Sequence, residues 1–232
     1  MSEGALLAMP LLWLTGTLGV FELFDRISKR CNRHPLLHPV LWSTPVLIGA
    51  LLVTGTSYDT YRQATFPLSF LLGPAVVGLA VPIWAERQRI RRLALPILLS
   101  LMAGALTSIV SAVGVLALFG APTALLASIA PRATTTPVAM AVAGQLGGIP
   151  ALAAIIVLFA GVLGAMVATP LLNAIKVRDY RARGFALGIA SHGIGAARAF
   201  QVDATAGALA SLGMALNAIA TAALLSMIAL LA

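Results

Sequence analysis

The polar residues best suited to chemistry gather in two short stretches that are otherwise apolar. One is 131–137, which holds an arginine and three threonines between two prolines, and the other is 187–195, where a serine and a histidine stand among glycines. Guanidinium, hydroxyl and free amide groups together favour a small carboxylate over a cation or a sugar. The residues that we expect at a substrate site are Arg132, Thr134, Thr135, Thr136, Ser191, His192, Gly193, Gly195 and Asn217.

Each stretch is predicted to begin a half-helix at membrane depth. Thr136 followed by Pro137 is typical of an N-cap and the first helical residue, and Ser191 is the corresponding N-cap in the second stretch. About nine residues of helix, rising about 1.5 Å each, precede 131–137 and reach the middle of a core about 30 Å thick. Two helix N-termini would then face each other there and stabilise an anion.

Each of these side chains also has a purely structural interpretation. Arg132 could extend to the outer membrane interface, and the threonines could bond to carbonyls at a proline kink. His192 could be a donor between helices, and Asn217 could join helices. Arg198, seven residues beyond Ser191, is more typical of an interface anchor than of a substrate contact.

Motifs of enzymes and nucleotide-binding proteins are missing from the sequence. It has no Ser/His/Asp arrangement, no paired carboxylates at a suitable spacing, no P-loop and no GxGxxG motif. We therefore expect neither an enzyme nor a bound cofactor. Cys31, His34 and His38 have a metal-like spacing, but prolines and cationic neighbours argue against a metal there.

The helices that carry the polar stretches must lie in a membrane. Of the 232 residues, 60% are hydrophobic and 9% are charged, whereas soluble domains carry about 25% charged residues. The mean hydropathy is +1.00, and several apolar runs approach the roughly 20 residues that cross a bilayer. This composition predicts an all-α polytopic membrane protein, surrounded by lipid, and excludes soluble enzyme folds and nucleic-acid partners.

The basic residues indicate the orientation of the chain, whose net charge is +8. Four basic residues fall in each of the loops 26–33, 87–92 and 176–183. Loops rich in Lys and Arg stay on the cytoplasmic side. We therefore predict a bacterial cytoplasmic (inner) membrane protein with these three loops inside, and we attribute the positive charge to topology rather than to an anionic partner.

Six crossings are predicted, with two further segments that are irregular. The crossings are 5–24, 36–54, 66–84, 93–119, 149–172 and 206–231. The stretch 122–147 is broken at its centre by prolines and polar residues, which predicts a re-entrant hairpin. The stretch 184–202 has two interpretations. A second hairpin would place both termini outside, whereas a broken helix that crosses would place the C-terminus inside.

An internal repeat pairs the two irregular segments. When the sequence is shifted by 57 residues, 134–135 falls on 191–192 and Gly104 falls on Gly161. Each unit would be a crossing helix followed by a hairpin, and units of opposite orientation form the inverted repeat typical of secondary transporters. The predicted parts are scaffold helices in 1–92, repeat units in 93–148 and 150–205, and a final helix in 206–231.

Three stretches together resemble the LrgB/CidB family of bacterial membrane proteins. They are Leu72-Gly73-Pro74-Ala75 through Ala80-Val81-Pro82, then 131–140 with Gly147-Gly148-Ile149-Pro150-Ala151, and finally Arg183-Gly184 through 191–195. Arg132 stands where the family often has Lys, which keeps the charge. Ala141 replaces a family carboxylate, which argues against a cation or proton role at that position, and the segment around Asp203 has fewer acids than the family usually shows.

The resemblance implies two functions. Family members were described as holin- or antiholin-like modulators of murein hydrolase activity and autolysis, which act with a small LrgA/CidA-type membrane protein. Related proteins, including the plastid glycolate/glycerate transporter, carry small monocarboxylates, and bacterial members are linked to pyruvate. Because of the repeat and the cationic site, we favour a transporter of the pyruvate, glycolate or glycerate class that works by alternating access. The holin-like function is the alternative, and coupling to Na⁺ or H⁺ and a homodimer stay open.

Overall fold

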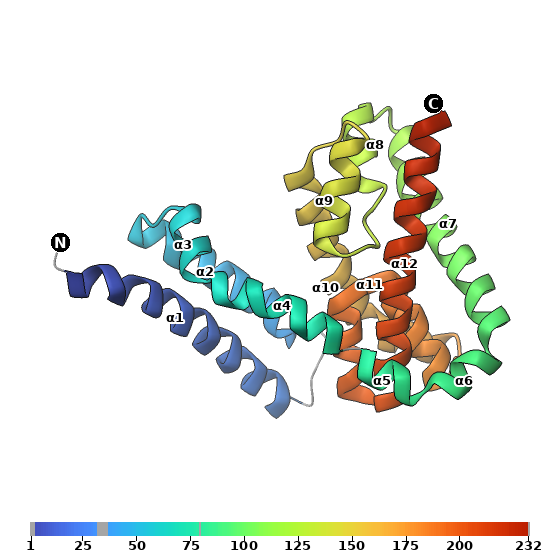
Figure 1. Ribbon diagram of the computed structural model, residues 1–232, viewed down its shortest axis with the longest axis horizontal. Helices are drawn as coiled ribbons and strands as arrows, with labels where there is room; N and C mark the ends of the chain where they lie inside the picture. Colours follow the sequence, from blue (N-terminus) through green and yellow to red (C-terminus); the bar gives the residue numbers. More distant parts are fainter. Residues whose placement is uncertain (1–2, 32–36, 79, 232) are drawn as a thin grey trace. The chain divides into compact units, whose positions relative to one another are not determined.

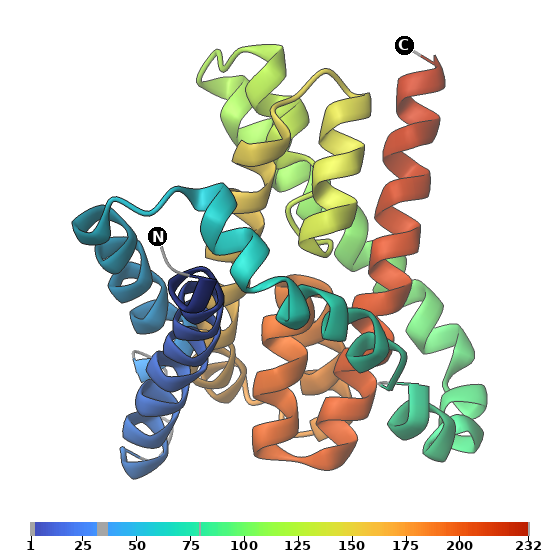
Figure 2. The same cartoon turned by 60° about the vertical axis from the view of Figure 1, so that its left-hand side comes forward.

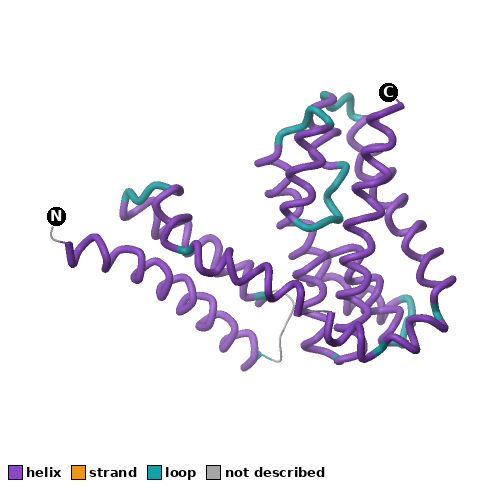
Figure 3. The backbone as a smooth tube through the Cα atoms, viewed as in Figure 1, coloured by secondary structure: helices purple, strands orange, loops and turns teal. Residues whose placement is uncertain are grey.

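The computed structural model describes residues 3–31, 37–78 and 80–231. All regular elements within these ranges are α-helices, twelve in number, which confirms the all-α prediction (Figure 1). Figure 3 shows the helices joined by short loops. The chain divides into two compact units, Met1–Gly78 and Leu79–Ala232, and each is described by itself.

The first unit is a small helical assembly. Its helices are α1 (Glu3–Arg30), α2 (Pro39–Thr54), α3 (Tyr58–Ala64) and α4 (Phe66–Gly78). The helix α2 ends because Gly55 takes a left-handed φ of 63°, and α3 then leaves at 119° to α2. Tyr61 of α3 holds α1, since its hydroxyl is 3.0 Å from Thr17 Oγ1 and its ring meets Trp13 edge-on.

The second unit contains three long apolar helices. Its elements are α5 (Ala80–Ala85), α6 (Arg87–Arg92), α7 (Ala94–Leu118), α8 (Thr123–Ile129), α9 (Thr136–Gln145), α10 (Pro150–Ala174), α11 (Tyr180–Val202) and α12 (Ala204–Leu231). The helices α7, α10 and α12 are long and apolar enough to cross a membrane. They confirm the apolar spans predicted at 93–119, 149–172 and 206–231.

The other three predicted crossings are not confirmed. Among the described residues, only the bent pair α2 and α3 could add a fourth span, if the two helices count as one. The predicted span 66–84 contains two helices, α4 and α5, on either side of residue 79, which lies outside the described residues. Six crossings therefore stay a prediction. His34 also lies outside the described ranges, so the Cys31/His34/His38 spacing is untested.

Two segments of the second unit fold back on themselves. The helices α8 and α9 are joined by 130–135 and pack against each other. In α11 the backbone leaves helical geometry at His192, with φ 42° and ψ −131°. Tyr180 and Val202, the first and last residues of α11, line the same small cavity. The segment is therefore a hairpin rather than a straight or crossing helix, and its two arms lie side by side in Figure 2.

The helix α12 is the centre of the second unit. It packs against α5, α7, α9 and most extensively α11. Gly184 and Gly188 bring α11 onto the α12 backbone, because a Cβ at these positions would stand 2.1 Å and 2.0 Å from the carbonyl oxygens of Ala206 and Ala210. Small residues thus allow the hairpin and α12 to approach as closely as membrane helices do at glycine-rich contacts.

Candidate functional site

The tips of the two hairpins are joined by one side chain of α12. Asn217 is fully buried, and its Nδ2 donates to the carbonyl of Ala133 at 2.8 Å and to the carbonyl of Ile189 at 3.3 Å. Ala133 lies in the tip between α8 and α9, and Ile189 lies in the first arm of α11, just before the break. The Oδ1 of Asn217 accepts a hydrogen bond from the hydroxyl of Thr221 at 3.3 Å. In this conformation both amide hydrogens of Asn217 are engaged by the protein.

The first tip differs by one residue from the expected N-cap. The helix α9 begins at Thr136, and Thr135 is its N-cap, without a capping bond from its side chain. The carbonyl of Thr135 already accepts the first helical bond, from the N–H of Ala139 at 2.9 Å. Pro137 fits the second helical position equally well because the amides of the first turn need no partner within the helix. The prediction that Thr136 is the N-cap is therefore wrong.

Thr134 has the structural role that was the alternative interpretation of the threonines. It is 1% exposed, and its Oγ1 donates to the carbonyl of Pro131 at 2.8 Å. This hydrogen bond joins two residues of the turn at the tip and so stabilises the turn. Thr135 and Thr136 are only partly buried.

Arg132 is the charged group of the first tip. It is partly buried, and its Nη2 lies 3.5 Å from Ser111 Oγ on α7, at the limit of a hydrogen bond. Its Nε is buried and has no hydrogen-bond partner among the described residues. The guanidinium group therefore has unused donors inside the protein.

Arg132 lines a cavity of about 520 Å³ between α7, the first tip and the first arm of α11. It is the one charged residue among the lining residues. The polar lining on α7 consists of Ser100, Thr107, Ser108 and Ser111. Ser100, Thr107 and Ser111 lie seven and four residues apart, and Ser108 lies three residues before Ser111, which places all four on one broad face of the helix. We did not predict this polar face, although the spacing of its hydroxyl residues within an otherwise apolar helix could have indicated it.

The second tip contacts α10 and does not line the cavity. The Nε2 of His192 lies 3.0 Å from the carbonyl of Val157, and because a carbonyl can only accept, Nε2 must carry the proton. His192 is thus a donor between helices, the structural role that we weighed against substrate binding.

Ser191 does not cap the second half of α11. It is fully buried, and its Oγ has no hydrogen-bond partner among the described residues. The helix breaks one residue later, at His192, which is why Ser191 still belongs to the first arm. The prediction that Ser191 is the N-cap is therefore wrong.

Two glycines of α10 form the surface on which the second tip rests. A Cβ at Gly161 would stand 2.5 Å from Cε1 of His192, and one at Gly164 would stand 2.0 Å from Oγ of Ser191. Gly195 has a similar role within α11, because a Cβ there would stand 2.4 Å from the carbonyl oxygen of Leu187. Sequence reasoning missed the packing role of Gly161 and Gly164, since glycines are common in this chain.

The nine predicted site residues do not converge on one cavity. Of the nine, only Arg132 lines the cavity of about 520 Å³. Ser191 and His192 face α10, Asn217 is engaged by both tips, and Gly193 is exposed. Asn217 binds a carbonyl in each of the two segments, but the polar side chains of the tips point into different contacts. The chemistry of this region rests on Arg132 and the hydroxyl groups of α7.

The fold and this region together define a multi-pass helical membrane protein in which Arg132 and hydroxyl groups of α7 line part of a largely apolar cavity beside two folded-back segments. A sequence profile described as the LrgB-like family matches residues 17–231. The chain belongs to this family, as its motifs predict.

Relatives of known sequence cover nearly the whole chain. The uncharacterized proteins YxaC and YwbG of Bacillus subtilis are 33% and 30% identical, over 90% and 88% of this chain and 89% and 94% of their own length. The holin-like protein CidB of Staphylococcus epidermidis is 29% identical over 93% of both chains. No solved structure matches the chain significantly.

Proposed function

We propose that this protein is a holin-like membrane protein of the CidB type, which controls permeation across the membrane. The near-full-length similarity to proteins named holin-like carries this proposal, since it covers 93% of the chain. The names of these relatives favour this function over the monocarboxylate carrier, which we expected from the repeat and the cationic site together with the family resemblance. A small LrgA/CidA-type membrane protein is its proposed partner, and modulation of murein hydrolase activity is the proposed consequence.

The polar face of α7 supports this proposal physically. Ser100, Thr107 and Ser111 are exposed although the helix around them is apolar, and they line the same cavity as Arg132, which approaches Ser111. Hydroxyl groups at membrane depth are tolerated where protein or a water-filled cavity covers them. Association with a second protein along α7 would enclose the cavity and line a water path with these groups.

Dye release from liposomes tests the holin-like function. Purified protein in vesicles loaded with carboxyfluorescein, with and without an LrgA/CidA-type partner, is expected to release dye steeply as the protein-to-lipid ratio rises. A triple replacement of Ser100, Thr107 and Ser111 by Ala should reduce release, because it removes the polar lining. The control is Gly114→Ala on the same helix, where nothing lies within 4 Å. Vesicles that stay sealed at every ratio, with or without the partner, would contradict the proposal.

Transport of small monocarboxylates is the second candidate function, and Arg132 is the observation that favours it. A guanidinium with unused donors, as the one charge lining a cavity of about 520 Å³, suits one carboxylate of the pyruvate, glycolate or glycerate size. The order of helix then hairpin occurs twice, in α7 to α9 and in α10 to α11. In Figure 1 and Figure 2, α7 and α10 run in opposite directions, which supports an inverted repeat and alternating access.

Uptake of labelled glycolate and pyruvate into proteoliposomes tests the carrier. Arg132→Gln should abolish saturable uptake, whereas Arg132→Lys should retain part of it, because the charge stays but the planar donor group is lost. The matched control is Arg91→Gln, which removes a charge from the exposed part of α6. Equal uptake by the unmodified protein and Arg132→Gln would disprove the role of Arg132. Dye release without saturable uptake would leave the holin-like function alone.

A further inference from the structure

Two further cavities lie between the cavity of about 520 Å³ and the basic end of the second unit. The nearer one has a volume of about 220 Å³ and shares Ser100, Ala182 and Phe185 with the lining of the first. The other, of about 470 Å³, shares Leu93 and Arg181 with the nearer one and is lined mainly by residues around α6. The three cavities therefore adjoin one another along α7 and the first arm of α11.

The row of cavities is a groove with walls of small side chains. Ala182, Ala186 and Ala190 are exposed and lie four residues apart, so they form one face of the first arm of α11. The facing wall is the polar face of α7. The floor is apolar, and it includes the buried side chains of Phe185 and Ile189. Small side chains on both walls leave room for a solute between the two helices.

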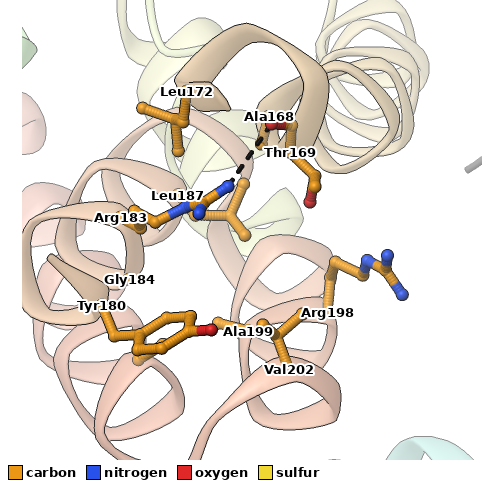
Figure 4. A pocket seen from close by; sticks show the side chains of 11 residues that line it. Ala168, Thr169, Leu172, Tyr180, Arg183, Gly184, Leu187, Arg198, Ala199 and Val202 are labelled. Atoms are coloured by element: carbon orange, nitrogen blue, oxygen red, sulfur yellow. Dashed lines mark hydrogen bonds between the residues drawn. The ribbon is translucent and has the colours of Figure 1, made fainter. Parts of the chain in front are cut away.

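The first arm of α11 is held in place from its other side. The Nη2 of Arg183 donates to Asn173 Oδ1 at 2.7 Å and to the carbonyl of Thr169 at 3.4 Å, both on α10. Figure 4 shows this guanidinium between the first arm and α10, at a separate cavity of about 30 Å³ that Gly184 and Leu187 also line. The contacts that position this wall of the groove therefore leave the groove itself free.

The charge of the lining changes along the groove. Arg92, Arg181 and Glu86 line the end near α6. Arg181 is paired there with Asp179, whose Oδ1 accepts from Arg181 Nε at 2.9 Å. The other end is lined by one charged residue, Arg132, whose Nε has no hydrogen-bond partner among the described residues. The outer part of the groove thus carries both signs of charge, and only its inner end favours an anion.

The polar lining leads to one end of the second unit only. On α7 it ends at Ser111, because the positions four and seven residues further along the same face are Val115 and Leu118. An apolar cluster packs α7 against the α8–α9 hairpin, and it includes the buried side chains of Ile109 and Val142. Hydroxyl groups therefore connect Arg132 with the end that carries α6 and the loop 176–183, and not with the opposite end.

We propose that this groove admits a small anion to Arg132 from the cytoplasmic side, so that the site opens inward in this structure. The basic residues of α6 and of the loop 176–183 place the open end inside. Exposed hydroxyl groups at membrane depth are tolerated where water reaches them. The inference rests on the proposed function of the Arg132 cavity and adds the side from which a solute enters. Access can be measured without transport, so the two proposals can fail separately.

Cysteine accessibility tests the path in the Cys31→Ser background. Ser100→Cys, Thr107→Cys and Ser111→Cys are expected to react with MTSES, an anionic methanethiosulfonate that does not cross membranes, in inside-out vesicles and not in intact cells. The matched control is Leu106→Cys, because Leu106 is exposed beside Thr107 but does not line the cavity. It should stay unreactive from both sides, since a thiol that faces lipid does not ionise.

The charge of the reagent tests the part played by Arg132. The ratio of the reaction rates of MTSES and the cationic MTSET should be about tenfold higher at Ser111→Cys than at Ser100→Cys. Arg132→Gln should remove this difference, whereas Arg132→Lys should keep it because the charge stays. An unchanged rate at Ser100→Cys shows that the variants still fold.

Three results would overturn the proposal. The first is reaction of Ser111→Cys in intact cells, since access would then not be from the cytoplasmic side alone. The second is no reaction of Ser111→Cys in inside-out vesicles in which Arg178→Cys reacts, since lipid or protein would then fill the groove. The third is a ratio at Ser111→Cys that Arg132→Gln leaves unchanged.

Discussion

At the scale of single residues, Asn217 links parts of the chain that are far apart in the sequence. It comes from the last helix, yet its amide binds carbonyls in two hairpins that are far apart in the sequence. A buried amide that satisfies two carbonyls is difficult to replace, because an apolar substitute leaves both acceptors without this donor. The conformation in which α12 links the two segments therefore depends on this residue.

Asn217→Leu is expected to lower the free energy of unfolding by about 1–3 kcal/mol, the usual penalty for leaving buried acceptors unsatisfied. Asn217→Asp should be at least as destabilising, since an acceptor would then face two carbonyls. Thr221→Val removes only the bond of 3.3 Å to Asn217 Oδ1 and should have a smaller effect. Thermal unfolding in detergent measures the series. A stability for Asn217→Leu equal to that of the unmodified protein would refute the bridging role.

At the scale of elements, each hairpin is positioned by close packing and by its ends. The tip of α11 rests on α10 because Gly161 and Gly164 leave room for His192 and Ser191. The start of α11 has a conventional cap, since Asp179 Oδ1 accepts from the N–H of Arg181 at 2.9 Å. The first contact is buried and the second is exposed, so they should respond differently to mutation and pH.

Gly161→Ala tests the packing of the α11 tip. A new Cβ 2.5 Å from the His192 ring forces the tip to move, and overpacking of this kind typically costs about 1–3 kcal/mol. Gly114→Ala, on α7, is the control, because nothing lies within 4 Å of its Cβ and alanine favours a helix by up to about 1 kcal/mol. Thermal unfolding should show the two substitutions moving the Tm in opposite directions. A Tm unchanged or raised in Gly161→Ala would contradict the packing.

The cap of α11 should make stability depend on pH. Hydrogen bonds from the Arg181 side chain and backbone lower the pKa of Asp179 from its ordinary value of 3.8. A lowered pKa means that the ionised carboxylate stabilises the fold above about pH 4 and that this contribution is lost as the pH falls through the folded-state pKa. Because Asp179 is exposed, the contribution is at most about 1 kcal/mol.

Comparison of the unmodified protein with Asp179→Asn across pH measures this contribution. The unmodified protein should be the more stable at neutral pH, and the difference should shrink as the pH falls below about 4 and disappear only below the lowered folded-state pKa of Asp179. A difference that is the same at every pH would mean that the charge of Asp179 has no part in it.

At the scale of the whole molecule, the candidate spans of the second unit predict on which side of the membrane each of its loops lies. The helices α7, α10 and α12 are three candidate spans, and the hairpins between them return to the side from which they start. The basic loop 176–183 and α6 should then lie on the cytoplasmic side. The loop at Ala121 and the C-terminus should lie on the opposite side.

Cysteine labelling tests this arrangement in a Cys31→Ser background, which removes the chain's one cysteine. A maleimide that cannot cross the membrane should label Ala121→Cys in intact cells and Arg178→Cys only after the cells are opened. A reporter fused after Ala232 should report the same side as Ala121. Labelling of both cysteines from the same side would refute three crossings in this unit.

Much of the second unit is predictable from local patterns. Prolines and polar residues at 131–137 break an apolar run, and glycines around His192 break another. The positions of both tips can therefore be predicted from the sequence. The lengths of α7, α10 and α12 follow from apolar runs matched to the bilayer. The places of Thr134 and Ser191 in buried tips follow for the same reason, but the bond of Thr134 to Pro131 and the contact of Ser191 with Gly164 do not.

The sequence by itself determined that this is an all-α membrane protein of the LrgB-like family, because composition, apolar run length and short motifs are local properties of the chain. Only the tertiary structure decided which polar groups meet. Asn217 reaches Ala133 and Ile189 across 84 and 28 residues, and His192 reaches Val157 across 35. Such bonds depend on how helices pack, and in a chain rich in Ala, Leu and Gly no local pattern records which faces come together.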